Sequence, residues 1–507
     1  MAISSPPQQT LHIVLNPASG VPGLSHSLFD AEITPLLANA GFNTGAIKKH
    51  ETRQAGDGVR IGREVRLDAL QRHASSATGG QGNGRGKVRA ILLGGDGTTH
   101  EFLHGLVLGS DDVDVDEEEA RGRSNDDDVN AEPPFDVELA VVPTGTANAL
   151  YAGLYPPSAP NEQQDDEGEG KEGEHAWRLR SVRALLDSLT ASDSASLTST
   201  QTLVPLTLLR TIAALSSPSE QSERKQRTLL AHIITSHALH AAILHDSEAL
   251  RATHPGIERF KLAAQKNAAV WVDGKLRLKS AASDVAGDEA GAVISVYEPA
   301  SDRFVPLAKA EHSTLDGPFL YLAALTTDRL EPHFVPGPFS TTAALAKAQG
   351  RAEGNASTSA NPHPRPPAAV DIVAIRPLRS PAVSQALTAL HSATSSASAF
   401  APLWMTAEAQ KLRVDFATGP LAKITPSMYT RGKHVYLTYP PHASAATTPA
   451  GDTAVKDEAL EERGKGQAVV EYYRAGGYEW EPVSHHASFL LATFQALSVR
   501  KLTDFRQ

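Results

Sequence analysis

The 507-residue sequence predicts two domains, an N-terminal α/β domain built on a parallel sheet and a mainly β C-terminal domain. Three observations lead to this prediction. Short apolar runs alternate with stretches of helical spacing in the first third of the chain, and two of these runs end in glycine-rich turns. Beyond about residue 200, β-rich runs replace this alternation.

The first third alternates predicted strands with predicted helices, which is typical of a parallel sheet with helices on both faces. The predicted strands are residues 11–15, 90–93 and 139–142. The predicted helices are residues 28–40, 101–108 and 147–154, with a further helix near 178–189.

The rest of the chain contains apolar runs that have the length and composition of strands. We expect strands at residues 204–210, 229–236, 270–278, 319–325, 370–376, 412–416, 434–437 and 469–473. Asp273-Gly274, inside the third of these runs, is typical of a hairpin turn. These runs predict the second, mainly β domain.

Glycine-rich turns follow two of the predicted N-terminal strands. Residues 93–101 read LGGDGTTHE, and residues 142–150 read VPTGTANAL. Each segment leads into a helix N-terminus, where free N–H groups and the helix dipole favour an anion. Gly94, Gly95 and Gly97 permit positive φ and close approach of the backbone to a ligand. The two turns therefore predict a phosphate-binding edge of the sheet.

Asp96 is a carboxylate inside this predicted anion site. Its charge is badly placed for simply holding phosphate. It is well placed to take a proton from a hydroxyl group or to bind Mg²⁺ near a transferred phosphoryl group. The position of Asp96 therefore favours phosphoryl transfer over passive phosphate binding.

The composition is that of an ordinary soluble protein, with 41% hydrophobic and 21% charged residues. The absence of cysteine excludes disulfides, thiolate zinc sites and cysteine nucleophiles. The first ten residues are polar, and we recognise no signal peptide and no membrane-spanning run. We therefore expect a cytoplasmic protein that is soluble or peripherally associated with a membrane.

Two acidic segments dominate the formal net charge of -11. Residues 110–134 and 161–175 carry net charges of -9 and -6, so the rest of the chain has a net charge of +4. Both segments lack aromatic residues and periodicity, which predicts disordered insertions on a mildly basic protein.

These features give predicted domain boundaries. The first domain covers residues 1–155 and includes the acidic insertion near 110–134, and an acidic linker and helix cover 156–200. The β-rich domain covers 201–507, with disordered insertions near 280–293, 346–369 and 441–466.

The motifs together resemble the diacylglycerol kinase catalytic-domain superfamily, and the branch that looks nearest is sphingosine (long-chain base) kinase. Asn16-Pro17-Ala18-Ser19-Gly20 follows the first strand, and Gly145-Thr146-Ala147-Asn148-Ala149-Leu150 resembles that branch's Gly-Ser-Gly-Asn-Ala-Leu turn. Residues 236–260 resemble the serine-glutamate, arginine and glycine-arginine-phenylalanine stretch of kinases that act on sphingoid bases and ceramide. The motifs occur in family order and cover most of the chain outside the insertions.

The resemblance implies a Rossmann-like nucleotide-binding domain, a β-sandwich lipid-binding domain, and transfer of the ATP γ-phosphate to a lipid hydroxyl with ATP and Mg²⁺ as cofactors. Asp96 would be the catalytic base and Glu101 a neighbour that orients it or the substrate. Nucleotide contacts would come from Asn16, Pro17, Thr52, Gly94, Gly95, Gly97, Thr98, Gly145, Thr146, Asn148, Arg251 and Arg259.

The resemblance also implies partners. A lipid substrate and a peripheral membrane surface are expected, and a nucleic-acid partner is not. The protein ligands of the metal and the oligomeric state stay open.

The chain departs from the family pattern in three places. Val21-Pro22-Gly23 supplies no lysine after the first motif. Ala242 and Leu244 stand where sphingosine kinases place the aspartate that holds the substrate amine. Near the C-terminus, Glu479 and Glu481 are the candidate substitutes for the family's aspartate-glycine-glutamate, which reaches towards nucleotide and metal.

Three alternatives stay open at this point. A diacylglycerol or ceramide kinase would share every motif, and a catalytically impaired lipid-binding member would explain the altered C-terminal acidic motif. A zinc hydrolase is the third, because His100-Glu101-Phe102-Leu103-His104 fits the zinc-protease pattern. No third ligand follows at a family spacing, so we prefer helix-surface or cleft histidines over a zinc site.

Overall fold

The chain forms two compact units in the computed structural model. The first comprises Met1–Leu206, Lys347–Ala352 and Val499–Gln507, and the second comprises Thr207–Ala346 and Glu353–Ser498. The described residues are 10–42, 47–78, 86–109, 135–156, 175–190, 204–215, 225–280, 293–307, 313–349, 363–393, 403–441, 455–483 and 491–498. The acidic insertion predicted near 110–134 and most of that near 280–293 lie outside these ranges. Parts of the other two predicted insertions, residues 363–369 and 455–466, are described and contain buried residues such as Arg365 and Val455.

The first unit contains a four-stranded parallel sheet in the order β2-β1-β3-β4. Its strands are β1 (Leu11–Leu15), β2 (Ile47–Glu51), β3 (Gly86–Gly94) and β4 (Phe135–Pro143). The crossover helices are α1 (Leu24–Leu28), a π-helical turn (Phe29–Ile33), α2 (Thr34–Asn39), α3 (Asp57–Thr78) and α4 (Asp96–Leu108), followed by α6 (Ala149–Leu154), a 3₁₀ turn (Ala176–Leu179) and α7 (Arg180–Thr190). The predicted α/β architecture is confirmed.

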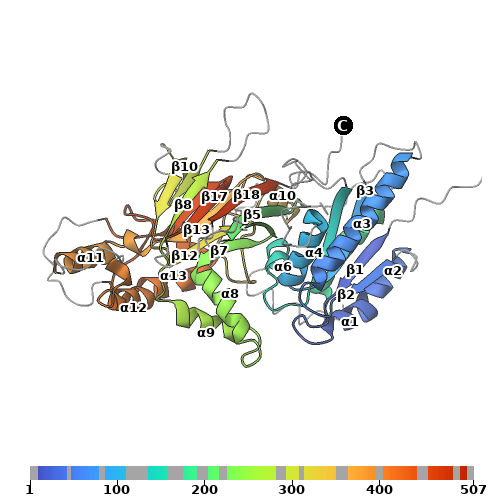
Figure 1. Ribbon diagram of the computed structural model, residues 1–507, viewed down its shortest axis with the longest axis horizontal. Coiled ribbons are helices and arrows are strands. Elements are labelled where there is room, and N and C mark those ends of the chain that lie inside the picture. Colours follow the sequence, from blue (N-terminus) through green and yellow to red (C-terminus); the bar gives the residue numbers. More distant parts are fainter. Residues whose placement is uncertain are drawn as a thin grey trace, which may run out of the picture. The chain divides into compact units, whose positions relative to one another are not determined.

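Apolar side chains cover both faces of this sheet, which explains the hydrophobic runs in β1, β3 and β4. The edge strand β2 is mostly polar and lacks such a run. On one face, Ile13 and Ile91 pack with α1, α2 and α7 through residues such as Leu37 and Val182. On the other face, Val14 and Leu92 pack with α3 and α4. Figure 1 shows the resulting three layers, in blue to cyan.

Glycines let α3 and α4 approach closely. A Cβ on Gly62 would lie 2.2 Å from the carbonyl oxygen of Phe102, and a Cβ on Gly105 would lie 2.0 Å from that of Val59. Each helix therefore uses a glycine where it meets the backbone of the other, and no larger residue fits there. This contact fixes α4, whose first residue is Asp96, against α3.

A buried histidine couples the stability of the first unit to pH. His12 is 1% exposed, and its ring lies 3.2 Å from His50. Burial, reinforced by the neighbouring His50, lowers the pKa of His12 to about 4. Between pH 6.5 and 4 the unfolded chain therefore binds more protons than the folded one, so stability falls as the pH falls through this window.

We expect acidification from pH 7 to pH 5 to cost about 2 kcal/mol at His12. Urea denaturation at the two pH values measures the loss. His12→Gln, which cannot titrate, should shrink the pH-dependent loss by that amount. An equal loss in wild type and variant would show that His12 does not contribute to it.

The second unit contains two six-stranded antiparallel sheets. One runs β10-β9-β16-β13-β12-β7, with bounds Arg303–Pro306, Ser295–Glu298, Glu471–Ala475, Val370–Ile375, Tyr321–Leu325 and Ile234–Ala238. The other runs β11-β8-β17-β18-β5-β6, with bounds Thr314–Asp316, Gly274–Lys279, Gly477–Pro482, Leu491–Ser498, Thr207–Leu215 and Lys225–Ala231. A small pair joins β14 (Leu437–Thr438) to β15 (Glu461–Glu462).

One hydrophobic core draws on both antiparallel sheets. Leu276 and Trp480 come from the sheet that contains β8, and Leu322, Ile372 and Tyr473 come from the sheet that contains β12. The antiparallel sheets agree with the expected mainly β second domain. In the second of these sheets, β18 lies between β17 and β5, which joins the end of the unit to its first strand.

Helices also belong to the second unit, and sequence reasoning missed most of them. They are α8 (Leu239–Ala249), α9 (Glu258–Asn267), α10 (Ala343–Ala348), α11 (Pro381–Ala393), α12 (Gln410–Thr418) and α13 (Pro420–Tyr429), with 3₁₀ turns at Pro377–Arg379, Leu403–Met405 and Lys433–Tyr436. The helices α8 and α9 pack side by side, in green in Figure 1. None of the helices in the described ranges is long and apolar enough to cross a membrane.

Two strand predictions and one turn prediction were wrong. Residues 412–416 belong to α12, where Phe416 is buried and Lys411 pairs with Asp415 one turn away, so helical spacing prevails. Residues 434–437 form mainly a 3₁₀ turn. Asp273-Gly274 is not a hairpin turn, because Val272 bridges Phe319 and β8 continues the same antiparallel pairing. A Cβ on Gly274 would lie 2.5 Å from the Trp480 ring, which accounts for the glycine.

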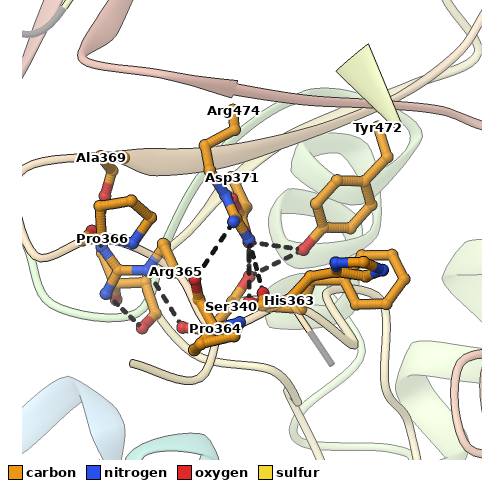
Figure 2. Close-up of polar contacts among 11 residues, drawn as sticks. Ser340, His363, Pro364, Arg365, Pro366, Ala369, Asp371, Tyr472 and Arg474 are labelled. Carbon is orange, nitrogen blue, oxygen red and sulfur yellow. Dashed lines mark hydrogen bonds and ion pairs between the residues drawn. The ribbon is translucent and has the colours of Figure 1, made fainter. Parts of the chain in front are cut away.

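A buried ionic network ties the segment 363–369 to the sheet that contains β13. Asp371 is fully buried and accepts hydrogen bonds from Arg474 Nε at 2.9 Å and Tyr472 Oη at 2.7 Å. Arg365, 2% exposed, donates to the carbonyl oxygens of Ser340 and Ala369 (Figure 2). Every buried charge in this network has a partner, as folded proteins require.

Candidate phosphate-binding site at the carboxyl edge of the parallel sheet

Three loops meet where β1, β3 and β4 end. They are residues 16–20, 95–98 and 144–148. In the strand order β2-β1-β3-β4, the chain adds β2 on one side of β1 and then β3 and β4 on the other side. Open parallel sheets bind their ligands outside the carboxyl ends of the strands, at the point where the strand order changes side in this way. The sequence motifs therefore lie at the position where this fold places a ligand.

Hydrogen bonds join the three loops. Asn16 donates from its side chain to Thr98 Oγ1 at 2.8 Å, and its backbone N–H donates to Leu93 O at 2.9 Å. The backbone N–H of Thr144 donates to Gly94 O at 3.2 Å. Pro17 turns the first loop, and its carbonyl accepts from Gly23 N–H at 3.4 Å. Asn16 and Thr98, which the sequence assigned to nucleotide contacts, thus also hold the loops together.

Glycines bring the loop backbones into direct contact. Gly20 has a φ of 66°, and a Cβ there would lie 1.8 Å from Thr144 O. A Cβ on Gly145 would lie 2.6 Å from the Cα of Gly95. A Cβ on Gly97 would meet nothing, so this glycine leaves open space beside the loop. The glycines therefore both close the loops on one another and keep backbone accessible.

Asn148 shapes the third loop from within. It has a φ of 53°, a left-handed conformation that asparagine tolerates better than most residues. Its Oδ1 accepts from the Gly145 N–H at 2.9 Å and its Nδ2 donates to Gly145 O at 2.7 Å. Thr146 is exposed at the tip of this loop. The Gly145 peptide, which the sequence proposed as a phosphate ligand, is held by Asn148.

Asp96 connects the second loop to the third. Its carboxylate accepts hydrogen bonds from the backbone N–H groups of Ala149 at 2.8 Å and Leu150 at 3.2 Å, at the start of α6. Burial raises the pKa of the Asp96 carboxyl, and these two hydrogen bonds oppose the rise. The residue as a whole is half-buried.

Glu101 lies one turn further along α4 and contacts α3. Its carboxylate accepts from the N–H groups of Gly56 and Gly58, each at 3.0 Å. The sequence suggested that Glu101 orients Asp96 or the substrate. In the structure it holds the start of α3, where free N–H groups need an acceptor.

Replacing Glu101 by alanine should lower the stability of the first unit by about 1–2 kcal/mol, because two N–H groups at a helix start lose their acceptor. Denaturant unfolding measures the change. Glu64→Ala is the matched control, since Glu64 forms only a partly exposed ion pair with Arg60 on the same helix. We expect that variant to lose less than about 0.5 kcal/mol. Equal losses in both would contradict the capping role.

Two threonines border the loops. Thr52 follows β2 and is 8% exposed, and its backbone N–H donates to Leu15 O at 2.9 Å. Thr144 was not among the predicted site residues. Its hydroxyl is buried without a hydrogen-bond partner among the described residues. Its place directly before Gly145, at the end of a strand, was the signal that could have identified it.

The predicted arginines lie in the second unit. Arg251 is exposed and pairs with Glu248 at 2.6 Å. Arg259 is 7% exposed and lies over the Phe260 ring at 4.7 Å, and its Nε has no hydrogen-bond partner in the described ranges. Burial, with the nearby charge of Arg251, lowers the pKa of Arg259. A buried cation with free hydrogen-bonding capacity suits an anionic ligand.

Glu479 and Glu481 also lie in the second unit, on β17. Arg277 on the neighbouring strand β8 contacts Glu481 at 2.9 Å and Glu479 at 3.7 Å. Lys279 contacts Glu479 at 2.8 Å. Both glutamates therefore take part in cross-strand ion pairs, the ordinary stabilising contacts of a sheet surface.

His100 and His104 lie on α4 with ring centroids 6.0 Å apart. The glutamate of the zinc-protease pattern is Glu101, which is bound to the start of α3. Among the described residues, no group of three or more His, Asp or Glu side chains is arranged to hold a metal ion.

The first unit is an α/β domain in which three loops converge at the carboxyl edge of a parallel sheet, the place where such folds bind their ligands. Residues 10–170 match the family model of the diacylglycerol kinase catalytic domain. The matched segment contains the three loops described above, and the match supports a relationship to that superfamily. The family implies a lipid kinase that uses ATP. No curated protein matches the sequence.

Proposed function

We propose that the protein transfers the γ-phosphate of ATP to the primary hydroxyl of a sphingoid long-chain base. The observation that carries the proposal is the meeting of three loops at the strand-order reversal, inside a segment that matches a lipid-kinase catalytic domain. The first loop comes from β1, the second from β3 and the third from β4.

The loops fit a nucleotide triphosphate. Glycine backbones lie in contact at Gly95 and Gly145, and the Thr144 hydroxyl offers a buried, unpartnered donor in the part of the chain that is described. Such backbone and hydroxyl groups suit phosphate oxygens. Mg²⁺ would be held largely by those oxygens, with Asp96 as the nearest acidic side chain, and would neutralise phosphate charge.

Asp96 is the proposed general base. Its carboxylate is held in place by two backbone N–H groups, and burial moves its pKa upward, towards values useful for proton transfer near neutral pH. It would accept the proton of the lipid hydroxyl as that oxygen attacks the γ-phosphorus. The glycine-rich loops would align the phosphates for in-line transfer.

The second unit is the proposed lipid-binding domain, and we propose that its two antiparallel sheets, which share one hydrophobic core, form a sandwich. Arg251 and Arg259 stay nucleotide contacts predicted from the family resemblance. The acceptor would reach the protein at a membrane surface, because long-chain lipids reside there.

A second candidate acceptor, diacylglycerol or ceramide, is favoured by the composition of α8. Its residues 239–245 read LHAAILH and contain no carboxylate. The next acidic residue, Asp246, is engaged by Asn267 at 2.8 Å and Lys266 at 2.9 Å. A lipid without an amine needs no such carboxylate.

Incubation of the purified protein with labelled ATP and Mg²⁺ tests the proposal. The acceptors are sphingosine, dihydrosphingosine, phytosphingosine, ceramide and diacylglycerol, each in mixed micelles. Label in a sphingoid-base phosphate supports the leading proposal, and label in phosphatidate or ceramide phosphate supports the second candidate. A folded protein that labels none of the five lipids would overturn both.

A further inference from the structure

A polar cavity of about 660 Å³ lies beside the end of β2. Its lining residues are Lys49, Glu51, Arg53, Gln54, Asp57 and Arg60. The volume is within the range of roughly 300–1,000 Å³ that is typical of small-molecule sites. Apolar side chains are missing from this lining, so the cavity suits a charged ligand.

Two cations in the cavity have no ion-pair partner among the described residues. Arg53 is exposed, and its guanidinium forms no hydrogen bond there. Lys49 lies over the Phe29 ring at 4.7 Å and contacts no carboxylate in those ranges. Both side chains can therefore bind an anion without first breaking an ion pair.

The carboxylates of the same cavity are already engaged. Asp57 accepts from the N–H groups of Arg53 at 2.7 Å and Gln54 at 3.2 Å, and it also pairs with Arg60. Glu51 contacts His26 at 3.1 Å. The lining holds three cations, Lys49, Arg53 and Arg60, against these two carboxylates, so its net charge is positive. Because Arg60 pairs with Asp57, Lys49 and Arg53 are the cations left to bind a ligand.

The cavity adjoins the first of the three loops. Leu15 and Glu51 lie opposite each other in the parallel pairing of β1 with β2. The next residues along the two strands, Asn16 and Thr52, are therefore neighbours at the carboxyl edge of the sheet. The loop after β1 carries no lysine or arginine through Gly23. Arg53, directly after Thr52, brings a positive charge to this part of the edge.

We propose that this cavity is a phosphate-binding site in which Arg53 and Lys49 hold a phosphate group. The inference deepens the proposed function, since the nucleotide triphosphate would extend from the loops towards Thr52. Arginine binds phosphate with two parallel hydrogen bonds and lysine binds it as a point charge. A phosphorylated lipid headgroup offers the same chemistry, so the test includes both sources.

Binding by the full-length protein is measured by titration calorimetry with inorganic triphosphate and with ATP, and by cosedimentation with phosphatidylcholine vesicles that contain phosphatidic acid. The variants are Arg53→Gln and Lys49→Gln. The matched control is Lys48→Gln, which removes the same charge from the same strand at a residue that pairs with Asp68. All three side chains are exposed, so the variants should fold.

We expect Arg53→Gln to weaken triphosphate and ATP binding about 10- to 100-fold, while Lys48→Gln stays within about twofold because exposed ion pairs contribute little. The same pattern for the phosphatidic acid vesicles alone would support the site with a lipid headgroup as its ligand. Unchanged binding of both ligands in Arg53→Gln would overturn the inference. An equal loss in Lys48→Gln would also overturn it, because net charge alone would explain the effect.

Neither ligand assay requires lipid phosphorylation, so the two proposals fail separately. Arg53-dependent triphosphate binding by a protein that phosphorylates no lipid would leave this site intact and remove the proposed kinase activity. A wild-type protein that phosphorylates a lipid, together with unchanged triphosphate binding in Arg53→Gln, would support the proposed kinase activity and exclude this phosphate site.

Discussion

Asp96→Asn should lower the turnover of lipid phosphorylation by about 10²- to 10⁴-fold, the usual contribution of a general base. Asparagine has the same shape but cannot accept a proton at neutral pH. One of its side-chain atoms can still accept a hydrogen bond from the start of α6, so the cost in stability should be about 1 kcal/mol. Initial rates at saturating ATP and lipid measure the effect.

The control for this variant is Asp68→Asn, which removes a carboxylate from α3 in the same unit. Asp68 forms ion pairs with Lys48 and Arg72 and is not one of the predicted site residues. Its turnover should equal that of the wild type. Near-normal turnover in Asp96→Asn would exclude Asp96 as the base. The two backbone hydrogen bonds would then be its whole role.

Asp371→Ala should lower the stability of the second unit by about 3–5 kcal/mol, the cost of leaving a buried charge without its partner. Arg474 would lose its only carboxylate among the described residues, and Tyr472 and Ser340 would lose an acceptor. This loss of stability should not change the three loops at the carboxyl edge of the parallel sheet directly, because they belong to the first unit. Guanidinium unfolding measures it.

Asp302→Ala provides the comparison for this prediction. Asp302 also accepts from a tyrosine and an arginine, Tyr297 at 2.6 Å and Arg463 at 2.7 Å, but its side chain is 34% exposed. Water can replace those partners, so we expect a loss of about 1 kcal/mol or less. Similar losses at the two aspartates would mean that burial does not set the strength of the Asp371 network.

The parallel sheet could be predicted from the sequence because β1, β3 and β4 are packed on both faces and each therefore contains an apolar run. The long helix α3 gave a weaker signal. Its buried residues, such as Ile61 and Val65, form a narrow stripe, and glycines take the places where it meets α4. Residues 412–416 alternate apolar and polar side chains, which favours a strand. In α12 only Leu412 and Phe416, four residues apart, share a face, and Val414 is exposed.

The candidate site was predictable in its residue types and less so in its contacts. Glycines and an aspartate after a strand point to phosphate chemistry wherever they occur. The partners of Asp96 and Glu101 lie 53 and 45 residues away in the sequence, so the sequence around each acidic residue does not reveal them. Asn148 instead binds Gly145 within its own loop. Thr144 and Arg53 carry no motif of their own, and only the folded edge gives them a possible ligand.

The position of β18 has a consequence for synthesis on the ribosome. The first strand of the second unit, β5, pairs with β18, which is formed by the last described residues. This side of β5 therefore stays unpaired until residues 491–498 have been synthesised. Until then β5 and β17 each present an open edge, the kind of surface that pairs with other chains. Nascent chains of this protein should therefore depend on protection from aggregation until residue 498 has emerged.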